Sequence, residues 1–385
     1  MGLATAYFGW KQLTPFSGQA TTIGTLERPA TTGTTIITTS TLGQAGVQVE
    51  TFLDRLRVPW SLAFAADGRI FLTERPGSVR IVENGKLRAE SFAQLDVASV
   101  GEGGLLGLAL SPSFSRDRYV YLYHTYRESS ALWNRIVRLT DAGSVGTDLK
   151  VIFDKIPGGN IHDGGRIRFG PDGKLYATAG ETGRREIAQD LNSLGGKILR
   201  LNPDGSIPND NPFPGSAVYS YGHRNPQGID FQPRTGRLYE TEHGPSGELG
   251  FAHDEINLIQ PGKNYGWPII VGKGNDPRFV DPLIDTGDET WAPSGASFYS
   301  GDQIPQWKDS FFVATLRGVH LHRIVFSAQG DSVVFQEKLY DSEFGRLRDV
   351  LTGPDGALYV VTNNTDGRGS PRPNDDRILR LFSKR

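Results

Sequence analysis

The residues RIRFGPDGKLYATAGE at 166–181 have the form of a strand, a tight turn and a second strand. A Pro-Asp-Gly turn between alternating apolar and polar residues is typical of a β-hairpin. The same form recurs in SLAFAADGRIFLTE (61–74), GIDFQPRTGRLYETEHG (228–244) and DVLTGPDGALYVVTNN (349–364), and less clearly at 106–126 and 295–318. Six such units, spaced by roughly 50 to 70 residues, predict an all-β protein: a six-bladed β-propeller of four-stranded antiparallel blades.

A closed propeller requires both ends of the chain to lie in one blade, because an incomplete ring leaves open sheet edges. VQVETFL (47–53) and RILRLF (377–382) both read as strands, and we expect them to meet in the same blade. The alternative is a pair of β-sandwiches with chance Asp-Gly turns. This alternative does not explain why four hairpins share both the turn residues and the pattern of the strands on either side of the turn.

The domain organisation follows from a change in composition near Val47. Residues 47–385 are predicted to form the propeller. Residues 1–46 are rich in threonine and lack a helical period, and we interpret them as a flexible leader or the remnant of an export or anchor segment. Because threonine is β-branched, one strand within this segment is also possible.

Composition excludes several functional classes. The chain has 41 Lys plus Arg against 43 Asp plus Glu, so no global basic field favours a nucleic acid or an anionic membrane. It has no Cys, which excludes disulfides and thiolate metal ligands. No run approaches the roughly 20 apolar residues of a membrane span.

Polar residues gather at the entrances of the repeated units, where a propeller surrounds its central funnel. His162 in NIHDGG (160–165) is suited to proton abstraction near neutral pH, although a structural role is open. Arg224 and Asn225 in GHRNPQG (222–228) offer hydrogen-bond donors. Arg346 and Arg348 lie two apart, and like charges on one strand face favour a shared anion over a surface pair.

Two further features are ambiguous from the residues alone. Glu102, among the glycines of GEGGLLG (101–107), could reach a ligand or be a solvated turn carboxylate. Gly244 and Pro245 could present carbonyl oxygens to a hard cation such as Ca²⁺, although their spacing is no known calcium motif. With Arg317, these residues predict a funnel that holds an anionic ligand while His162 acts on a second, neutral substrate.

Several motifs together resemble one family over roughly residues 50–383: the soluble quinoprotein sugar dehydrogenases, comprising glucose/sorbosone and aldose sugar dehydrogenases. The motifs are GEGGLLGLALSP (101–112), HDGGRIRFGPDGKLY (162–176), GHRNPQG (222–228), EHGP (242–245), DEINLI (254–259), NYGWP (264–268), APSG (292–295) and RLRDV (346–350). The resemblance implies a six-bladed propeller that binds pyrroloquinoline quinone (PQQ) with Ca²⁺. It also implies oxidation of an aldose at C1 to the lactone.

The resemblance also implies roles for individual residues. His162 would be the general base, with Arg224 beside it in the catalytic site. The residues implied to bind the cofactor are Arg224, Asn225, Thr290, Arg317, Arg346 and Arg348. Glu102 and Asp163 would contact the sugar, Gly244 and Pro245 the catalytic Ca²⁺, and Glu255 and Tyr265 a second, structural calcium.

The sequence departs from the family pattern at four positions. Glu102 stands where Gln is frequent, Arg317 where Lys is frequent, Ile161 where some members have Asp, and His243 where Gln occurs. These departures leave the preferred sugar open, and the electron acceptor is unknown. A periplasmic or secreted monomer or homodimer is expected from the family. A calcium-dependent lactonase-like hydrolase and a non-catalytic binding propeller remain alternatives.

Overall fold

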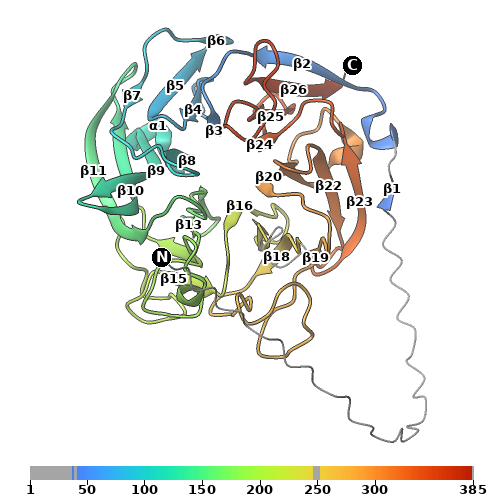
Figure 1. The fold of residues 1–385 in the computed structure, drawn as a ribbon. Helices are drawn as coiled ribbons and strands as arrows, with labels where there is room; N and C mark the ends of the chain where they lie inside the picture. Colours follow the sequence, from blue (N-terminus) through green and yellow to red (C-terminus); the bar gives the residue numbers. More distant parts are fainter. Residues whose placement is uncertain (1–36, 39–40, 246–251, 384–385) are drawn as a thin grey trace, which may run out of the picture. The chain divides into compact units, whose positions relative to one another are not determined.

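Each repeated hairpin forms the two inner strands of a four-stranded antiparallel sheet, and six such sheets are arranged around a central axis (Figure 1). The computed structural model describes residues 37–38, 41–245 and 252–383. The prediction of an all-β, six-bladed β-propeller is therefore confirmed. Helical structure in the described chain is limited to short turns: η1 (Thr41–Gln44), α1 (Phe114–Asp117), η2 (Arg185–Ala188) and η3 (Pro305–Trp307).

The strands follow the chain blade by blade. Blade 1 contains β3 (Pro59–Phe64), β4 (Ile70–Glu74), β5 (Ser78–Glu83) and β6 (Lys86–Leu87), with β7 (Ala93–Gln94) also paired to β5. Blade 2 contains β8 (Leu105–Leu110), β9 (Tyr119–Glu128), β10 (Ala131–Asp141) and β11 (Gly146–Pro157). Blade 3 contains β12 (Ile167–Phe169), β13 (Leu175–Ala179), β14 (Lys197–Leu201) and β15 (Val218–Tyr221).

The second half of the ring repeats this arrangement. Blade 4 contains β16 (Pro226–Phe231), β17 (Leu238–Glu242), β18 (Glu255–Ile259) and β19 (Ile284–Asp285). Blade 5 contains β20 (Pro293–Phe298), β21 (Phe311–Thr315), β22 (Leu321–Phe326) and β23 (Val333–Leu339). Blade 6 contains β24 (Leu347–Thr352), β25 (Leu358–Thr362), β26 (Ile378–Ser383) and β2 (Val47–Leu53).

Blade 6 closes the ring as expected, because β2 from the start of the fold pairs antiparallel with β26 at its end. Val47 pairs with Ser383, and Thr51 pairs with Leu379. The two-residue strand β1 (Ile37–Thr38) lies within the threonine-rich segment and pairs in parallel with β23. The flexible leader is predicted over residues 1–46, of which residues 1–36 and 39–40 lie outside the described residues, and Thr41–Gln44 form η1.

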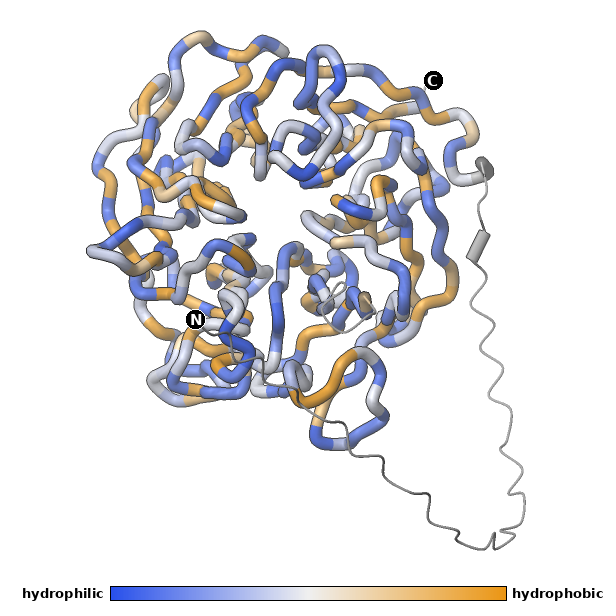
Figure 2. Tube along the Cα trace, viewed as in Figure 1, coloured by the Kyte–Doolittle hydropathy of each residue, from blue (hydrophilic) through white to orange (hydrophobic). Residues whose placement is uncertain are grey.

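Apolar side chains fill the space between neighbouring sheets. Between blades 2 and 3, for example, Leu106 and Tyr121 pack with Ala177 and Leu199. Figure 2 shows hydrophobic and hydrophilic residues interleaved around the whole ring, as expected when every blade packs against two neighbours. In the described part of the chain, no helix is long and apolar enough to cross a membrane.

The topology places the functional loops at one end of the ring. The first strands of the blades, β3, β8, β12, β16, β20 and β24, pack on one another around the axis. The first strand of each blade pairs antiparallel with the second strand. The residues just before the first strand and those just after the second strand therefore lie at the same end of the blade. The candidate residues preceding β12, β16, β20 and β24 therefore converge on one funnel.

Candidate active site

The funnel contains a cavity of about 410 Å³ that brings together residues from several of the predicted motifs. Its wall is formed by Glu102, Ile161, His162, Arg224, His243, Thr290, Ala292, Leu316, Arg317, Arg346 and Arg368. A smaller, deeper cavity shares Glu102, His243, Leu316, Arg346 and Arg368 and adds Trp60, Arg75, Asp163, Gly164, Gln227, Arg348 and Asp366. Six of the predicted residues thus line the upper cavity, and Arg348 and Asp163 line the deeper one.

His162 forms a buried pair with Glu181, whose Oε1 lies 2.6 Å from the imidazole Nδ1. The carboxylate accepts a hydrogen bond from Nδ1–H, which leaves the lone pair of Nε2 available to take up another proton. Both side chains are buried, and His162 belongs to the cavity wall. This arrangement, a base oriented by a carboxylate, is suited to proton abstraction.

Glu181 was not singled out in the sequence, although it ends the hairpin motif at 166–181. The register of that hairpin pairs Ile167 with Ala177. Extending the same register outward brings residues 162–163 opposite 181–182. The contact between His162 and Glu181 could therefore have been predicted by extending the hairpin register beyond the ends of its strands.

Glu102 joins His162 to a distant arginine. Its Oε2 accepts the backbone N–H of His162 at 2.8 Å, and its Oε1 accepts Nη1 of Arg368 at 2.7 Å. Burial would raise the pKa of Glu102, but the imidazoles of His243 and His162, the His162 N–H and Arg368 lower it to about 2. Burial lowers the pKa of His243 to about 3, so His243 is neutral near pH 7 and Arg368 supplies the compensating charge there. The sequence reading missed Arg368.

Asp163 is held beneath the cavity rather than in its upper wall. Its Oδ1 accepts Nδ2 of Asn134 and the backbone N–H of Gly159, both at 3.0 Å, and the residue is 1% exposed. Burial raises its pKa to about 7 despite these hydrogen bonds. The assignment of Asp163 to the sugar stays a prediction, since the structure gives its Oδ1 to the protein and places the residue in the deeper cavity.

The arginines of blade 6 differ in how their charges are balanced. Arg346 donates to Asp366, with Nη2 at 2.7 Å from Oδ2. Arg348 is buried and donates only to neutral oxygens, those of Gln227 and Ser294 at 3.2 Å and of Asn363 at 3.3 Å.

Arg348 forms no ion pair with any carboxylate in the described chain. Burial lowers its pKa to about 9; the charge of Asp366 opposes this shift, and the neighbouring guanidiniums of Arg346, Arg75 and Arg166 add to it. Arg75, also on the deeper cavity, has its pKa lowered by burial too. A buried cation without a charged partner is costly. This end of the funnel therefore fits an anionic ligand.

Arg224 and Asn225 lie at the entrance of blade 4. Arg224 donates Nη1 to the carbonyl of His243 at 3.1 Å, and its guanidinium lies 5.4 Å from the ring centroid of Trp267. Oδ1 of Asn225 accepts the Gly164 N–H at 3.1 Å. Its Nδ2 is buried and has no hydrogen-bond partner among the described residues, which leaves one donor available at this position.

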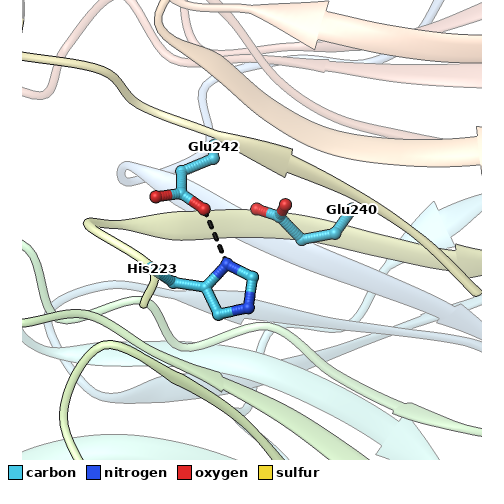
Figure 3. Close-up of side chains that lie close together, drawn as sticks. All are labelled: His223, Glu240 and Glu242. Atoms are coloured by element: carbon cyan, nitrogen blue, oxygen red, sulfur yellow. Dashed lines mark hydrogen bonds and ion pairs between the residues drawn. The ribbon is translucent and has the colours of Figure 1, made fainter. Parts of the chain in front are cut away.

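Blade 4 also carries a cluster of buried carboxylates next to the funnel. Figure 3 shows Glu240 and Glu242, both on β17, facing the imidazole of His223. Nδ1 of His223 lies 2.8 Å from Oε2 of Glu242, and Asn257 donates to both Glu240 and Glu255 at 3.1 Å. Burial, together with the charge of Glu242, raises the pKa values of Glu240 and Glu255 well above the usual range.

The residues proposed as metal ligands meet beside this cluster. Gly244, Pro245, Glu255 and Tyr265 line one small cavity together with Glu242. Buried carboxylate and carbonyl oxygens are the donors that Ca²⁺ prefers, so the residues present fit a hard cation. Glu240 and Glu242 were missed, although the ETE spacing on a strand places both on one face.

Comparisons with known proteins cover nearly the whole described chain. A family model described as glucose/sorbosone dehydrogenase matches residues 56–379. The chain is 38% identical over 356 residues to the aldose sugar dehydrogenase YliI of Escherichia coli, covering 85% of this chain and 94% of that protein.

Two solved structures share the fold at high sequence identity. One is a putative glucose dehydrogenase of Thermus thermophilus, 50% identical with a TM-score of 0.81, covering 88% of this chain and all of the other. The second is the PQQ-bound aldose sugar dehydrogenase of Streptomyces coelicolor, 40% identical with a TM-score of 0.77, covering 88% and 98% of the two chains.

Proposed function

The chain belongs to the glucose/sorbosone dehydrogenase family, and from this premise we propose that it is a PQQ-dependent aldose dehydrogenase that oxidises sugars at C1 to the lactone. The observation that carries the proposal is the His162–Glu181 pair on the wall of an arginine-rich cavity. A base alone would serve many reactions. A base close to several arginines, one of which (Arg348) donates only to neutral oxygens, favours a reaction in which a polyanionic cofactor lies beside a neutral sugar.

The residues of the funnel fit PQQ, a tricarboxylate. Arg348 is a buried cation that forms no ion pair with the residues that the structure describes and lines the deeper cavity, and Arg317 is exposed and lines the upper one. Together with Arg224, Asn225, Thr290 and Arg346, they would hold the cofactor and its carboxylates. When bound, PQQ supplies the acceptor for the hydride that leaves C1 of the sugar.

His162 would act on the sugar itself. Its Nε2 would accept the proton of the C1 hydroxyl, and the Glu181 carboxylate would stabilise the imidazolium that forms. Glu102, whose carboxylate lies in the cavity wall beside His162, would contact the sugar hydroxyls. Asp163 is placed less favourably for this role, because it is 1% exposed and lines the deeper cavity, whereas the Glu102 side chain is 22% exposed in the upper one.

Calcium is part of the proposal. The carbonyl groups of Gly244 and Pro245 would contribute to a catalytic Ca²⁺ site, and Glu255 and Tyr265 to a second, structural one. The buried carboxylates of Glu240 and Glu242 support a cation in this part of blade 4. The family also supports a periplasmic or secreted location, with a sugar as substrate and an electron acceptor that is still to be identified.

Reconstitution tests this function. Purified protein is mixed with PQQ and CaCl₂, and reduction of an electron-accepting dye is followed with a panel of aldoses. We expect dye reduction that requires both PQQ and an aldose. Hydrolysis of a lactone without PQQ would favour the hydrolase alternative, and PQQ binding without dye reduction for any aldose would overturn the catalytic proposal.

A further inference from the structure

Arg368, in the loop between the second and third strands of blade 6, forms an ion pair with a cavity residue from a distant part of the chain. It lies between β25 and β26, and its Nη1 lies 2.7 Å from Oε1 of Glu102, 266 residues away. The side chains are 56% and 22% exposed, and both residues line the upper cavity next to His162. The ion pair therefore lies at the mouth of the cavity rather than on an unrelated surface.

The turn that carries His162 is unusual in its backbone. His162 has φ of 58°, in the left-handed region that is unfavourable for a residue with a side chain. Such a conformation persists only when neighbouring groups hold it. A change in this backbone would move the imidazole away from Glu181 and from the cavity.

Glu102 provides much of that support. Its backbone N–H donates to the carbonyl of Asn160 at 2.9 Å, and its carboxylate accepts the N–H of His162 at 2.8 Å. The turn and the Glu102 loop approach closely, because a Cβ at Gly101 would lie only 1.9 Å from the Asn160 carbonyl oxygen. Glu102 thus binds the turn on both sides of Ile161, through its backbone and its side chain.

We propose that Arg368 is a positioning residue for the reaction: it holds the Glu102 carboxylate in the orientation that fixes the backbone of His162, and hence its imidazole. The inference rests on the proposed role of His162 as the base. A glutamate side chain has three rotatable bonds, so one hydrogen bond to the His162 N–H fixes it poorly. Nη1 of Arg368 donates a charged hydrogen bond to the second oxygen, which limits its movement and compensates the charge of the carboxylate.

The proposal explains why a carboxylate stands at position 102. Both oxygens are used, one for His162 and one for Arg368. A glutamine could still accept the His162 N–H through its single oxygen, but its amide nitrogen would then face the Arg368 guanidinium. We therefore expect Glu102 and Arg368 to act as one unit.

The test compares Arg368→Ala, Arg368→Lys, Glu102→Gln and the double variant Arg368→Ala/Glu102→Gln. The matched control is Arg372→Ala, in the same loop, because the guanidinium of Arg372 donates only to the backbone carbonyls of Glu343 and Ser342. Dye-reduction kinetics give kcat and KM. Selective ¹⁵N-histidine labelling of the cofactor-free protein gives the exchange rate of the His162 amide, assigned with His162→Gln among only seven histidines.

We expect Arg368→Ala to lower kcat about fivefold, the scale of a partly exposed ion pair, with a smaller change in KM. The His162 amide should exchange several-fold faster, Arg368→Lys should recover part of both effects, and Arg372→Ala should match the wild type. Arg368→Ala should have no further effect on kcat in the Glu102→Gln background.

An unchanged amide exchange rate in Arg368→Ala would overturn the proposal. So would a rise in KM with kcat unchanged, because Arg368 would then be only a substrate contact. The amide measurement needs neither cofactor nor substrate. Absence of dehydrogenase activity in the wild type would thus overturn the proposed function, while the amide exchange rate would still decide whether Arg368 fixes the His162 backbone.

Discussion

Nη1 of Arg166 lies 3.0 Å from Oδ2 of Asp349, and this buried ion pair joins blade 3 to blade 6 across the axis of the propeller. The same guanidinium donates to Ser61 in blade 1 at 3.0 Å and to the carbonyl of Gln227 in blade 4 at 3.2 Å. It also lies 4.2 Å from the ring centroid of Trp60. Arg166, which precedes the first strand of blade 3, thus contacts three other blades (1, 4 and 6) near the axis of the propeller.

Asp349→Asn should be among the most destabilising single substitutions in the chain. It leaves the buried Arg166 charge uncompensated, which typically costs about 3–5 kcal/mol of the free energy of unfolding. Chemical denaturation measures the change. The control is Asp355→Asn, whose ion pair with Arg380 is partly exposed, at 35% and 20% for the two side chains, with an expected loss of at most about 1 kcal/mol. Equal losses in the two variants would contradict a special role for the axial pair.

Arg348→Met should maintain or raise the thermal stability of the cofactor-free protein and reduce the stabilisation that PQQ provides. Without cofactor, it removes a buried cation that has no carboxylate partner, so the melting temperature should stay constant or rise. With PQQ, the stabilisation by the ligand should shrink, because an anion-binding group is lost. Thermal unfolding with and without PQQ tests both effects, with Arg116→Met as an exposed control. Wild-type stabilisation by PQQ in Arg348→Met would refute the anion-binding role.

Asp163 should make the stability of the cofactor-free protein depend on pH. Its pKa is raised from 3.8 to about 7 by burial, so the folded protein binds a proton that the unfolded chain releases between these values. The resulting stabilisation is fully present below about pH 4 and is lost as the pH rises through about 7, at up to about 1.4 kcal/mol per pH unit.

Asp163→Asn should flatten this part of the stability profile, because the amide cannot ionise and its oxygen can still accept the two hydrogen bonds. Denaturation midpoints measured between pH 4 and 8 give the comparison. The exposed Asp148→Asn should follow the wild-type profile. If Asp163→Asn kept the wild-type slope, the raised pKa would be refuted.

The carboxylate cluster of blade 4 should make the protein respond to calcium. Ca²⁺ should raise the melting temperature and a chelator should reverse the effect, since a ligand that binds only the folded state stabilises it. Glu240→Gln should be at least as stable as the wild type without Ca²⁺, because it removes repulsion among buried carboxylates. It should gain less on adding Ca²⁺. A wild-type response in Glu240→Gln would exclude this carboxylate from the cation site.

The fold was predictable because its signal is repeated along the sequence. Turn residues such as those of GPDGK at 170–174 occur at similar places in each unit, and β2 and β26 have clear strand character at the two ends. The cavity residues just before the inner strands were found for the same reason: the hairpin pattern marks where each inner strand begins.

The missed residues depend on contacts between distant parts of the chain. Arg368 lies in an irregular loop, and nothing in its local sequence indicates a partner 266 residues away. Glu240 and Glu242 lie in a strand that reads as an ordinary hairpin arm, because burial of their carboxylates comes from packing around β17. Likewise, the sequence could not reveal that Arg346 is neutralised by Asp366 whereas Arg348 is not.

In the proposed reaction His162, oriented by Glu181, removes the proton from the sugar. The most direct measurement is the rate of aldose-dependent dye reduction by PQQ- and Ca²⁺-loaded His162→Ala, with cofactor binding determined on the same sample. We predict that His162→Ala binds PQQ but loses at least about 100-fold in kcat, the usual contribution of a general base. A His162→Ala protein that binds PQQ and retains wild-type kcat would contradict the account.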